Sequence, residues 1–522
     1  MTPVDTFARD GLPPREQWPD LLIEPFGYPA RLNCAVELLD AAVRAGHSAR
    51  PALITDTATT SYGELAELVA RIGHVLVDDL GVVSGNRVLL RAPNTPMLVA
   101  CWLAVARVGG VVVATMPLLR RRELQQISEH AAIGLALCDD RFTEELEGAC
   151  ERVVRFGELE LRAAGKPAHL EPCDTAADDV VLIAYTSGTS GRPKGTMHFH
   201  RDVLAICDTF AREVLRPRAD DVFIGSPPIA FTFGLGGLVT FPMRVGAASV
   251  LLEAAGPDNL LAAIERHGAT VCFTAPTAYR RMLALGVDGR LGSLRRCVSA
   301  GETLPAAVFH AWRAATGIRL IDGIGATEML HIFISAADDE IRPGATGRAV
   351  PGFEARVVDE QMRDVGPGVV GRLAVRGPTG CRYLNDVRQL DYVRDGWNLT
   401  GDAYLVDEDG YFHYQARIDD MIVSGGYNIA APEVEQVLLE HDAVLECAVV
   451  AWPDEARGTI VKAFVVLRDG HDPGEALVGE LQDFVKARIA PYKYPRAIEF
   501  IDELPRTETG KLTRYVLRER GG

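Results

Sequence analysis

A stretch rich in glycine and hydroxyl side chains, residues 185–195, offers the clearest chemistry in this sequence. It reads Tyr-Thr-Ser-Gly-Thr-Ser-Gly-Arg-Pro-Lys-Gly and follows an apolar run at residues 180–184. Glycines let a backbone approach phosphate groups closely, while hydroxyl and N–H groups supply hydrogen-bond donors. Lys194 adds a positive charge, although the Lys-Gly order differs from the Gly-Lys-Ser/Thr of a Walker loop. The segment therefore predicts a phosphate-binding loop of another kind.

Four more motifs follow in the chain. They read Asp-Gly-Ile-Gly-Ala-Thr-Glu at 322–328, Gly-Trp-Asn-Leu-Thr-Gly-Asp at 396–402, Arg-Ile-Asp-Asp at 417–420 and Pro-Arg-Thr-Glu-Thr-Gly-Lys at 505–511. Together with the first, and in this order, they resemble the signatures of the acyl-adenylate-forming superfamily, which includes acyl- and aryl-CoA ligases, peptide-synthetase adenylation domains and firefly luciferase. That family usually has an aromatic residue where Ile324 stands. The resemblance implies that a carboxylic acid is activated by ATP and then passed to a thiol.

The resemblance also assigns residues to the nucleotide. Asp402 would hold the ribose hydroxyls and Arg417 would donate to the same sugar, since a carboxylate accepts and a guanidinium donates. Thr327 would donate to the α-phosphate, and Glu328 would be the protein ligand of Mg²⁺, which favours oxygen atoms and bridges to phosphates. The full ATP- and AMP-binding set is Thr186, Ser187, Gly188, Thr189, Ser190, Gly191, Lys194, Gly301, Glu302, Asp322, Gly323, Ile324, Thr327, Asp402 and Arg417.

Lys511 is the residue expected to drive the first half-reaction. The carboxylate of the acid attacks the α-phosphorus of ATP, so two anions must meet while negative charge builds on the phosphoryl oxygens. A lysine placed between them counters that repulsion. Thr327 and Glu328 complete the expected catalytic set. Without its motif, Lys511 would be interpreted as an exposed lysine in a turn.

Asp419 stands where the family has a hinge between two domains. Closed one way, the C-terminal lid would present Lys511 to ATP. After rotation it would present a glycine turn to coenzyme A, and domain closure about a few junction residues is a known way to gate successive steps. The residues expected at the coenzyme A channel are Ser424, Gly425 and Gly426. The alternative for Asp419 is an ordinary surface acid before a strand.

The acid substrate is indicated by residues 227–234, which read Pro-Pro-Ile-Ala-Phe-Thr-Phe-Gly, and whose two aromatic rings suit a flat aryl acid. Residues 299–305 and 329–333 resemble the benzoate and 2-aminobenzoate CoA-ligase branch. By that resemblance the walls of the acyl pocket are Phe231, Thr232, Phe233, Ala300, Gly325, His331 and Ile332. Core packing is the alternative for the apolar members and a structural role is the alternative for His331. Thr232, a small polar group, tilts the preference from benzoate towards 2-aminobenzoate.

The thiol is expected to be coenzyme A, because the branch uses it and only eleven residues follow Lys511, too few for a carrier domain. A second possibility is a stand-alone adenylating enzyme that loads a carrier protein. A third is a catalytically silent homologue that binds nucleotide without turnover. Such a protein is expected to lose the phosphate loop, Glu328 or Lys511, and all three are present.

The elements that must position these residues follow an α/β pattern. Short Val- and Ile-rich runs alternate with helical patterns up to about residue 370, and shorter strands with turns follow. We expect an N-terminal AMP- and acyl-binding domain at 1–418, made of doubly wound α/β subdomains and a β-rich subdomain, and a small mobile α+β lid domain at 419–522 that carries Lys511. Residues 97–119 predict a buried helix, a glycine stop and a strand rather than a transmembrane helix.

Composition restricts the class of protein. The 522 residues include 54 basic and 71 acidic ones, and the net charge of −17 disfavours binding to nucleic acid or to anionic membranes. The ten cysteines contain no Cys-x-x-Cys pair, and the N-terminus lacks the apolar core of a signal peptide, so we expect a cytoplasmic protein with reduced thiols. The expected partners are a small aromatic carboxylate, ATP and coenzyme A or a carrier protein. No sequence feature points to an oligomeric state.

Overall fold

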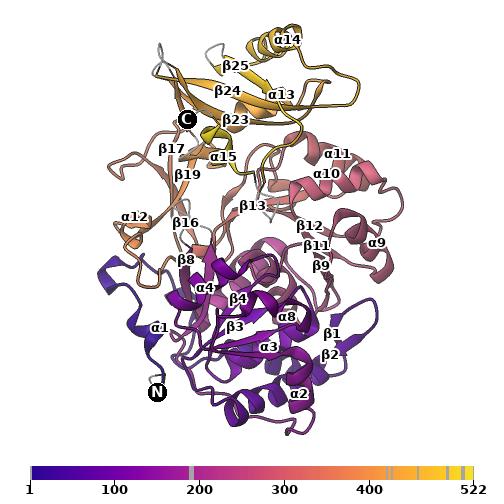
Figure 1. Ribbon diagram of the computed structural model, residues 1–522, viewed down its shortest axis with the longest axis vertical. Helices are drawn as coiled ribbons and strands as arrows, with labels where there is room; N and C mark the ends of the chain where they lie inside the picture. Colours follow the sequence, from indigo (N-terminus) through magenta and orange to yellow (C-terminus); the bar gives the residue numbers. More distant parts are fainter. Residues whose placement is uncertain are drawn as a thin grey trace. The chain divides into compact units, whose positions relative to one another are not determined.

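The computed structural model in Figure 1 describes residues 3–186, 193–418, 421–424, 427–454, 458–489, 493–506 and 512–520. The chain packs as two compact units. The first comprises Met1–Arg356 and Ala374–Leu399, and the second comprises Val357–Leu373 and Thr400–Gly522. Each unit is described below on its own.

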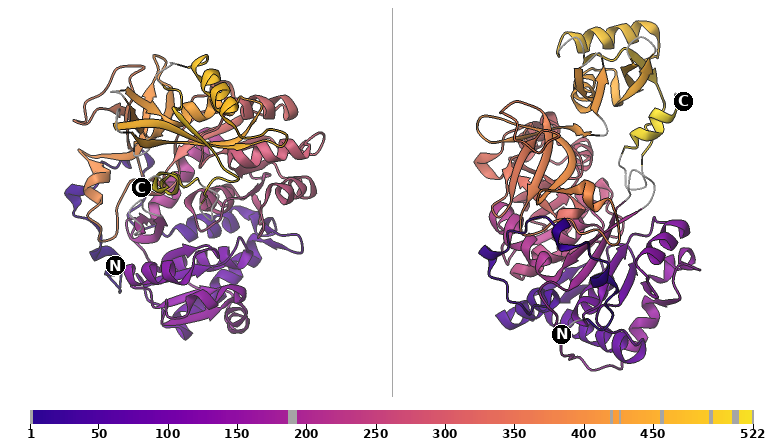
Figure 2. Two further views of the ribbon diagram at one scale, coloured as in Figure 1. Left: turned by 45° about the horizontal axis from the view of Figure 1, so that its top comes forward. Right: turned by 90° about the vertical axis from the view of Figure 1, so that its left-hand side faces the viewer.

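The first unit contains a mostly parallel sheet. Its strands lie in the order β6 (Arg152–Arg155), β5 (Leu135–Cys138), β3 (Arg87–Arg91), β4 (Val111–Thr115), β7 (Val180–Thr186) and β8 (Lys194–Phe199). β8 runs antiparallel to β7, whereas the other neighbours run parallel. The helices of this region are α2 (Tyr62–His74), α3 (Pro96–Arg107), α4 (Arg121–His130) and α5 (Phe156–Ala163). α3 contacts β3 and β4, and α2 packs on α3. These elements are labelled in Figure 1, and Figure 2 shows the ribbon from two further sides.

The predicted helix, glycine stop and strand at residues 97–119 are confirmed. The hydroxyl of Thr95 accepts a hydrogen bond from the backbone N–H of Leu98, and Pro96 occupies the first turn of α3, where its missing N–H costs nothing. The turn at Gly109, with φ of +77°, then redirects the chain into β4. Residues 98–107 are all buried, which explains their apolar composition.

A second sheet of the first unit carries most of the motifs. Its order is β15 (Arg348–Ala349), β14 (Ile332–Ser335), β13 (Leu320–Gly325), β12 (Arg296–Ser299), β11 (Val271–Thr274), β9 (Val222–Gly225), β10 (Ala248–Val250), β1 (Pro51–Ile54) and β2 (Thr59–Ser61). The strands from β13 to β1 run parallel, and β14, β15 and β2 are antiparallel to their neighbours. The two sheets confirm the predicted doubly wound α/β class.

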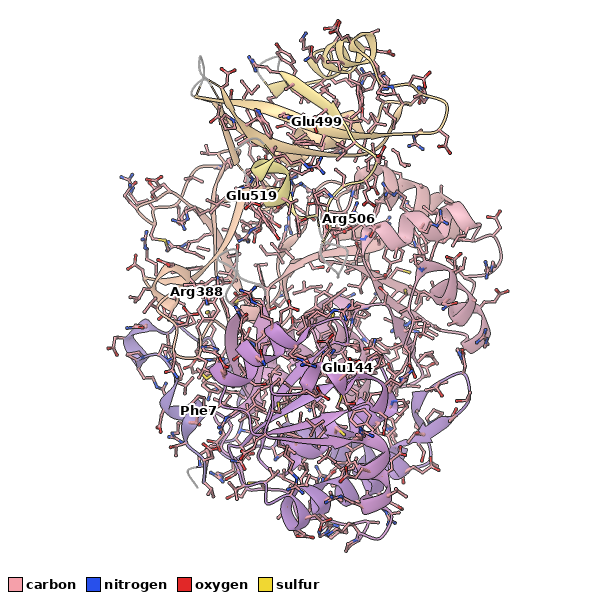
Figure 3. The ribbon with its side chains drawn as sticks, viewed as in Figure 1. Phe7, Glu144, Arg388, Glu499, Arg506 and Glu519 are labelled. Atoms are coloured by element: carbon pink, nitrogen blue, oxygen red, sulfur yellow. The ribbon has the colours of Figure 1, made fainter. Side chains whose placement is uncertain are left out.

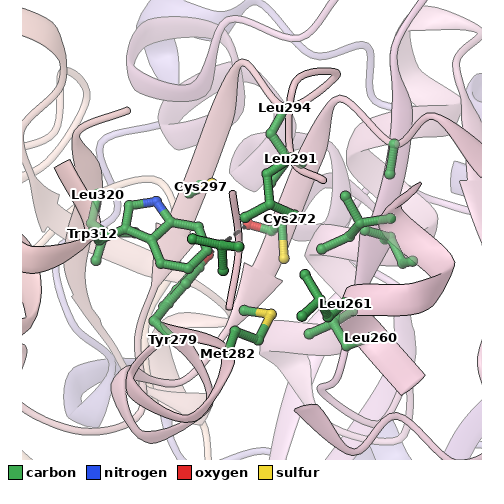
Figure 4. Packing of buried hydrophobic residues seen from close by; sticks show 14 of the residues in the cluster. Leu260, Leu261, Cys272, Tyr279, Met282, Leu291, Leu294, Cys297, Trp312 and Leu320 are labelled. Carbon is green, nitrogen blue, oxygen red and sulfur yellow. Dashed lines mark hydrogen bonds between the residues drawn. The ribbon is translucent and has the colours of Figure 1, made fainter. Parts of the chain in front are cut away.

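Helices α9 (Pro257–His267), α10 (Pro276–Leu285) and α11 (Ala306–Thr316) lie side by side and share a core with β11 and β12 (Figures 1 and 4). Tyr279 is central to that core. Its hydroxyl donates to the carbonyl of Cys272 and to that of Val298, and its ring meets Trp312 edge to face at 4.7 Å. A buried phenol with a satisfied hydroxyl fixes the strands as well as filling space.

Other helical segments of the first unit are α1 (Phe7–Asp10), α6 (His200–Ile206), which continues as a π-helix at Cys207–Leu215, α7 (Thr232–Leu235), a π-helix at Gly236–Thr240, α8 (Phe241–Val245) and α12 (Gln389–Tyr392). The β-rich region predicted near residue 371 is confirmed as a sheet of β16 (Glu354–Val358), β17 (Gly371–Arg376), β19 (Trp397–Val406) and β18 (Val393–Arg394), with β20 (Phe412–Arg417) paired to β19.

The C-terminal residues form the predicted α+β arrangement. They comprise the hairpin of β21 (Met421–Ser424) and β22 (Tyr427–Ala430), the sheet of β23 (Val444–Asp454), β24 (Gly458–Leu467) and β25 (Ala497–Phe500), and helices α13 (Ala431–Leu438), α14 (Glu475–Lys486) and α15 (Arg514–Glu519). The apolar stripe of α13 packs with β23, β24 and α14 in one core. Among the described helices, none has the length and apolar character needed to cross a membrane.

Candidate functional site

The candidate site lies at the carboxyl ends of the parallel strands of the second sheet. Residues 226–234 follow β9, residues 300–302 follow β12, and residues 326–329 follow β13. Parallel strands bring their carboxyl ends to one edge, where ligands of open α/β sheets bind. The sequence-predicted residues that this edge collects are Phe231, Thr232, Phe233, Ala300, Gly301, Glu302, Asp322, Gly323, Ile324, Gly325, Thr327 and Glu328.

The end of β13 forms a tight turn that presents the motif. Thr327–Met329 is a short 3-10 helix, and Leu330 follows with φ of +67° before the chain returns as β14. Two glycines allow this close return. A Cβ on Gly323 would stand 2.7 Å from a methyl group of Ile332, and one on Gly325 would stand 2.8 Å from the carbonyl oxygen of His331.

Side chains hold three successive residues of this turn. The Nε2 atom of His198 donates to the carbonyl oxygen of Thr327 at 2.8 Å, and the hydroxyl of Thr379 donates to that of Met329 at 2.7 Å. Between them, the hydroxyl of Tyr383 donates to Oε1 of Glu328. Burial first, and then the charge of Glu328, raise the pKa of the Tyr383 hydroxyl above its ordinary value, so that it stays a donor.

The predicted phosphate loop joins β7 to β8. Thr186 ends β7 and pairs with Lys194, the first residue of β8. Ser187, Gly188, Thr189, Ser190 and Gly191 lie outside the described residues. The ammonium of Lys194 stands 5.3 Å from the ring centroid of Tyr383, so the loop's lysine shares a neighbour with Glu328. The first unit thus brings the lysine of one motif and the carboxylate of another to the same tyrosine.

Asp322 sits inside β13, and burial raises the pKa of its carboxyl group to about 7. The hydroxyl of Ser335 on β14 donates to its backbone carbonyl at 2.5 Å. The Oδ1 atom of Asp322 is buried and makes no hydrogen bond within the described part of the chain. Ile324, two residues further along the chain, is half-buried. It stands where the family usually has an aromatic side chain, so no aromatic ring is available at this position.

His331 lies among phenylalanine rings rather than in a polar setting. Its ring is 4.6 Å from that of Phe241, 5.3 Å from Phe210 and 5.7 Å from Phe233. Its residue is 3% exposed, neither ring nitrogen has a hydrogen bond among the described residues, and burial lowers its pKa to about 3. A Cβ on Gly236 would stand 2.4 Å from this ring, so that glycine makes room for it. The imidazole is therefore neutral.

The other expected pocket residues show mixed exposure. Thr232, Ala300 and Ile332 are buried, whereas Phe231 and Phe233 are half-buried. Phe233 also packs on Phe273 at 5.5 Å. The Phe273 contact of Phe233 and the burial of Ile332 fit core packing as well as they fit a wall of the acyl pocket. Gly301 is exposed, with φ of +89°, and Glu302 beside it is half-buried.

Sequence reasoning missed Asn94, which fixes the aromatic segment from far away in the chain. Its side-chain amide donates to the carbonyl of Pro227 at 3.0 Å and accepts from the backbone N–H of Ile229 at 2.8 Å. It also missed His198, Thr379 and Tyr383. None of these four residues lies in the five motifs described above. Only their tertiary contacts show which segments they hold.

The second unit presents the predicted ribose-binding pair. Asp402 on β19 lies opposite Arg417 on β20 in the strand register. Nη1 of Arg417 donates to the carbonyl of Thr400 at 2.8 Å and to Oδ1 of Asp402 at 3.2 Å. Gly401 has φ of +78°, and a Cβ there would stand 2.6 Å from Nη2 of Arg417. The sheet therefore sets a carboxylate and a guanidinium side by side, with a glycine that leaves room for the cation.

The remaining predicted residues fall at or beyond the edges of the described segments. The hydroxyl of Ser424 donates to the carbonyl of Thr459 at 2.7 Å, so it supports the sheet. Gly425, Gly426, Asp419 and Lys511 lie outside the described residues.

The residues on either side of Lys511 are firmly held. Arg506, labelled in Figure 3, pairs with Leu512 in an antiparallel bridge. The guanidinium of Arg514 contacts both carboxylate oxygens of Glu435 at 2.8 Å.

Comparison with known families gives two matches along the chain. Residues 39–383 match the AMP-binding enzyme family, and residues 433–511 match the AMP-binding enzyme C-terminal domain. The first match ends at Tyr383 and the second at Lys511.

Individual relatives are similar over nearly the whole chain. A benzoate–CoA ligase of Thauera aromatica is 36% identical over 508 residues, which cover 94% of this chain and 96% of that protein. The crystal structure of the anthranilate CoA ligase AuaEII in complex with anthranoyl-AMP has a TM-score of 0.89 and 35% identity, and covers 95% of this chain and 98% of that one. The p-hydroxybenzoic acid–AMP ligase FadD22 of Mycobacterium tuberculosis is 33% identical over 491 residues, covering 94% of this chain and 69% of that protein.

Proposed function

Because the chain belongs to the AMP-binding enzyme family, we propose that it is an AMP-forming aryl-CoA ligase, which makes an acyl-adenylate from an aromatic carboxylate and then the CoA thioester. The observation that carries this proposal is the turn at Thr327 and Glu328 at the carboxyl edge of the sheet. His198 and Tyr383 hold this turn, and Lys194 lies over the Tyr383 ring. Its similarity to a benzoate–CoA ligase over 94% of the chain supports the aryl substrate class.

The acid is 2-aminobenzoate or benzoate. Similarity to a benzoate–CoA ligase and to the AuaEII anthranilate CoA ligase supports these two acids. Two half-buried rings, Phe231 and Phe233, are available to a flat aryl group, and Thr232 lies between them in sequence. The neutral imidazole of His331 has both a donor and an acceptor nitrogen, which suits an ortho amino group better than a charged group.

In the first half-reaction an oxygen of the substrate carboxylate attacks the α-phosphorus, and pyrophosphate leaves. Lys511 offsets the repulsion between the two anions, and the hydroxyl of Thr327 donates to the α-phosphate. Lys194 and the Ser- and Gly-rich loop hold the outgoing phosphates. Asp402 and Arg417 hold the ribose, for which their cross-strand contact provides a preformed pair.

Glu328 is the protein ligand that fits Mg²⁺. Its Oε1 atom receives the Tyr383 hydrogen bond, and its Oε2 atom has no hydrogen bond among the residues described, so a hard anionic oxygen remains. The described residues form no group of three or more His, Cys, Asp or Glu side chains suited to a metal, and Mg²⁺ is typically held by one or two carboxylates and substrate phosphates. Bound there, the ion would neutralise phosphate charge.

In the second half-reaction the sulfur of the thiol attacks the acyl carbon, the bond to the phosphate oxygen breaks and AMP leaves. We assign residues 1–418 to an N-terminal domain and 419–522 to a mobile lid that turns about Asp419 between the two steps. Ser424, Gly425 and Gly426 then line the thiol channel, and the hydroxyl of Ser424 donates to the carbonyl of Thr459.

A second candidate acceptor is a carrier protein. The observation that favours it is the similarity to FadD22, a p-hydroxybenzoic acid–AMP ligase. Under that alternative the first half-reaction is unchanged, and free coenzyme A gives no thioester.

The test is a panel of acids assayed with ATP, Mg²⁺ and free coenzyme A, with thioester, AMP and pyrophosphate measured in each reaction. We expect benzoate or 2-aminobenzoate to give the highest kcat/KM, above hydroxybenzoates and well above a straight-chain aliphatic acid. A preference for the aliphatic acid would reject the aryl class. Adenylate without thioester, restored by a phosphopantetheinylated carrier, would favour the second candidate.

A further inference from the structure

We propose that His198, Thr379 and Tyr383 form a clamp that holds the Thr327–Met329 turn and aims the free oxygen of Glu328 at the metal–nucleotide substrate. The clamp rests on the function proposed above. Each of the three side chains bonds a different one of three consecutive residues. His198 precedes the turn in the sequence, and Thr379 and Tyr383 follow it. All three are positioning residues, since they act through the turn.

Tyr383 reaches Glu328 from a backbone that is itself fixed. Its segment runs alongside β8 through an antiparallel bridge with Thr196. On either side of that bridge, the N–H of Met197 donates to the carbonyl of Arg382 and the N–H of Leu384 donates to the carbonyl of Gly195, both at 2.8 Å. Tyr383 is only 1% exposed, so the surrounding side chains fix the position of its ring. The hydroxyl is therefore delivered to Oε1 by strand pairing.

His198 lies against a buried ion pair. Its donation to Thr327 requires a proton on Nε2. Its Nδ1 atom faces the carboxylate of Asp202 at 3.7 Å, and that carboxylate is paired with the guanidinium of Arg382. All three side chains have 0% exposure. Arg382 precedes Tyr383, so one two-residue segment supports both the Thr327 carbonyl and the Glu328 carboxylate.

Thr379 completes the clamp from the same stretch of chain. It is fully buried, and its hydroxyl donates to the Met329 carbonyl at 2.7 Å. With the carbonyls on both sides held, the backbone of Glu328 cannot rotate without breaking a buried hydrogen bond, which is costly. Partners of this kind, one shell behind a metal ligand, typically change metal affinity or activity by 10–100-fold when removed.

The test compares two buried tyrosines that lose the same atom. Tyr383→Phe keeps the ring over which Lys194 lies and removes only the hydroxyl. Tyr62→Phe is the matched control, because Tyr62 is also fully buried and its hydroxyl also makes one hydrogen bond, to the Ala247 carbonyl at 2.7 Å. We expect Tyr383→Phe to raise the Mg²⁺ concentration for half-maximal pyrophosphate release by about 10-fold, with the KM of the acid unchanged. Tyr62→Phe should leave both unchanged.

Binding of Mn²⁺ to the full-length protein with a non-hydrolysable ATP analogue, followed by electron paramagnetic resonance, gives a readout apart from turnover. Affinity should fall in Tyr383→Phe and in Thr379→Val, and recover in Thr379→Ser, which restores the hydroxyl. Metal dependence within about twofold of wild type in both Tyr383→Phe and Thr379→Val would overturn the clamp. Absence of pyrophosphate release by the wild-type protein would instead overturn the proposed function, so the two failures are distinct.

Discussion

The imidazole of His331 is surrounded by Phe210, Phe233 and Phe241 and titrates far from its ordinary range. Burial lowers its pKa to about 3, whereas in the unfolded chain it is near 6.5. Between these values the unfolded state binds the extra proton, so this histidine makes the protein less stable as the pH falls from 6.5 towards 3. The same burial keeps the ring uncharged throughout the pH range of a normal assay.

We therefore predict that His331→Leu reduces the loss of stability in acid. From pH 7 to pH 5 the free energy of unfolding should fall by about 2 kcal/mol less in the variant than in the wild-type protein. Chemical denaturation at the two pH values measures it. His169→Leu serves as the control, because that side chain is 79% exposed and should leave the slope unchanged. Equal slopes for wild type and His331→Leu would contradict a neutral buried ring.

For single residues, the sequence predicts which residues belong to the site better than it predicts what surrounds their side chains. The motifs placed Asp402 and Arg417 at one sugar, and the structure does set them opposite each other. For His331 the sequence indicates a substrate contact or a structural role, and the structure adds that its ring lies among aromatic side chains. That outcome depends on rings contributed by α8 and the π-helix after α6, which no local pattern connects to residue 331.

Strands β19 and β20 place Gly401 against the guanidinium of Arg417. Gly401 and Gly410 both have positive φ, +78° and +80°, but only at Gly401 does a guanidinium occupy the space of a side chain. We predict that Gly401→Ala and Gly410→Ala each lose about 1–2 kcal/mol of stability from the strained backbone. Only Gly401→Ala should also raise the KM for ATP, by about tenfold. The added methyl group displaces the guanidinium of Arg417, and the loss of one charged hydrogen bond to the ribose is of this size.

Thermal or chemical denaturation and ATP-dependent initial rates, measured on the same two preparations, separate these effects. Equal KM values in Gly401→Ala and Gly410→Ala would remove Arg417 from the nucleotide site. A raised KM in both variants would mean that the hairpin as a whole, not the cation, is what the substrate needs.

Elements themselves were largely predictable. Alternating Val- and Ile-rich runs with helical patterns gave β7, β10, β11 and the helix–strand pair at 96–115, because burial imposes a readable period on local sequence. What the pattern could not give is which strand lies beside which. The approach of residues 382–384 to β8, and the reach of Asn94 to residues 227–229, join segments more than 130 residues apart. Such pairings depend on the packed fold and leave no local trace.

For the whole molecule, the proposed mechanism has Lys511 serve only one of the two half-reactions. On either side of Lys511 along the chain, Arg506 pairs with Leu512 and Arg514 contacts Glu435, all within the second unit. In the proposed mechanism, Lys511 faces ATP in one domain orientation and is carried away in the other. The two half-reactions should therefore respond differently to its loss.

The most direct measurement of this claim is acid-dependent exchange of labelled pyrophosphate into ATP, without coenzyme A, alongside thioester formation from supplied acyl-adenylate. Wild type should perform both. Lys511→Ala should lose about 100- to 1000-fold in the exchange while thioester formation stays within a few-fold of wild type. Equal loss of both half-reactions, or exchange at the wild-type rate in Lys511→Ala, would contradict the account.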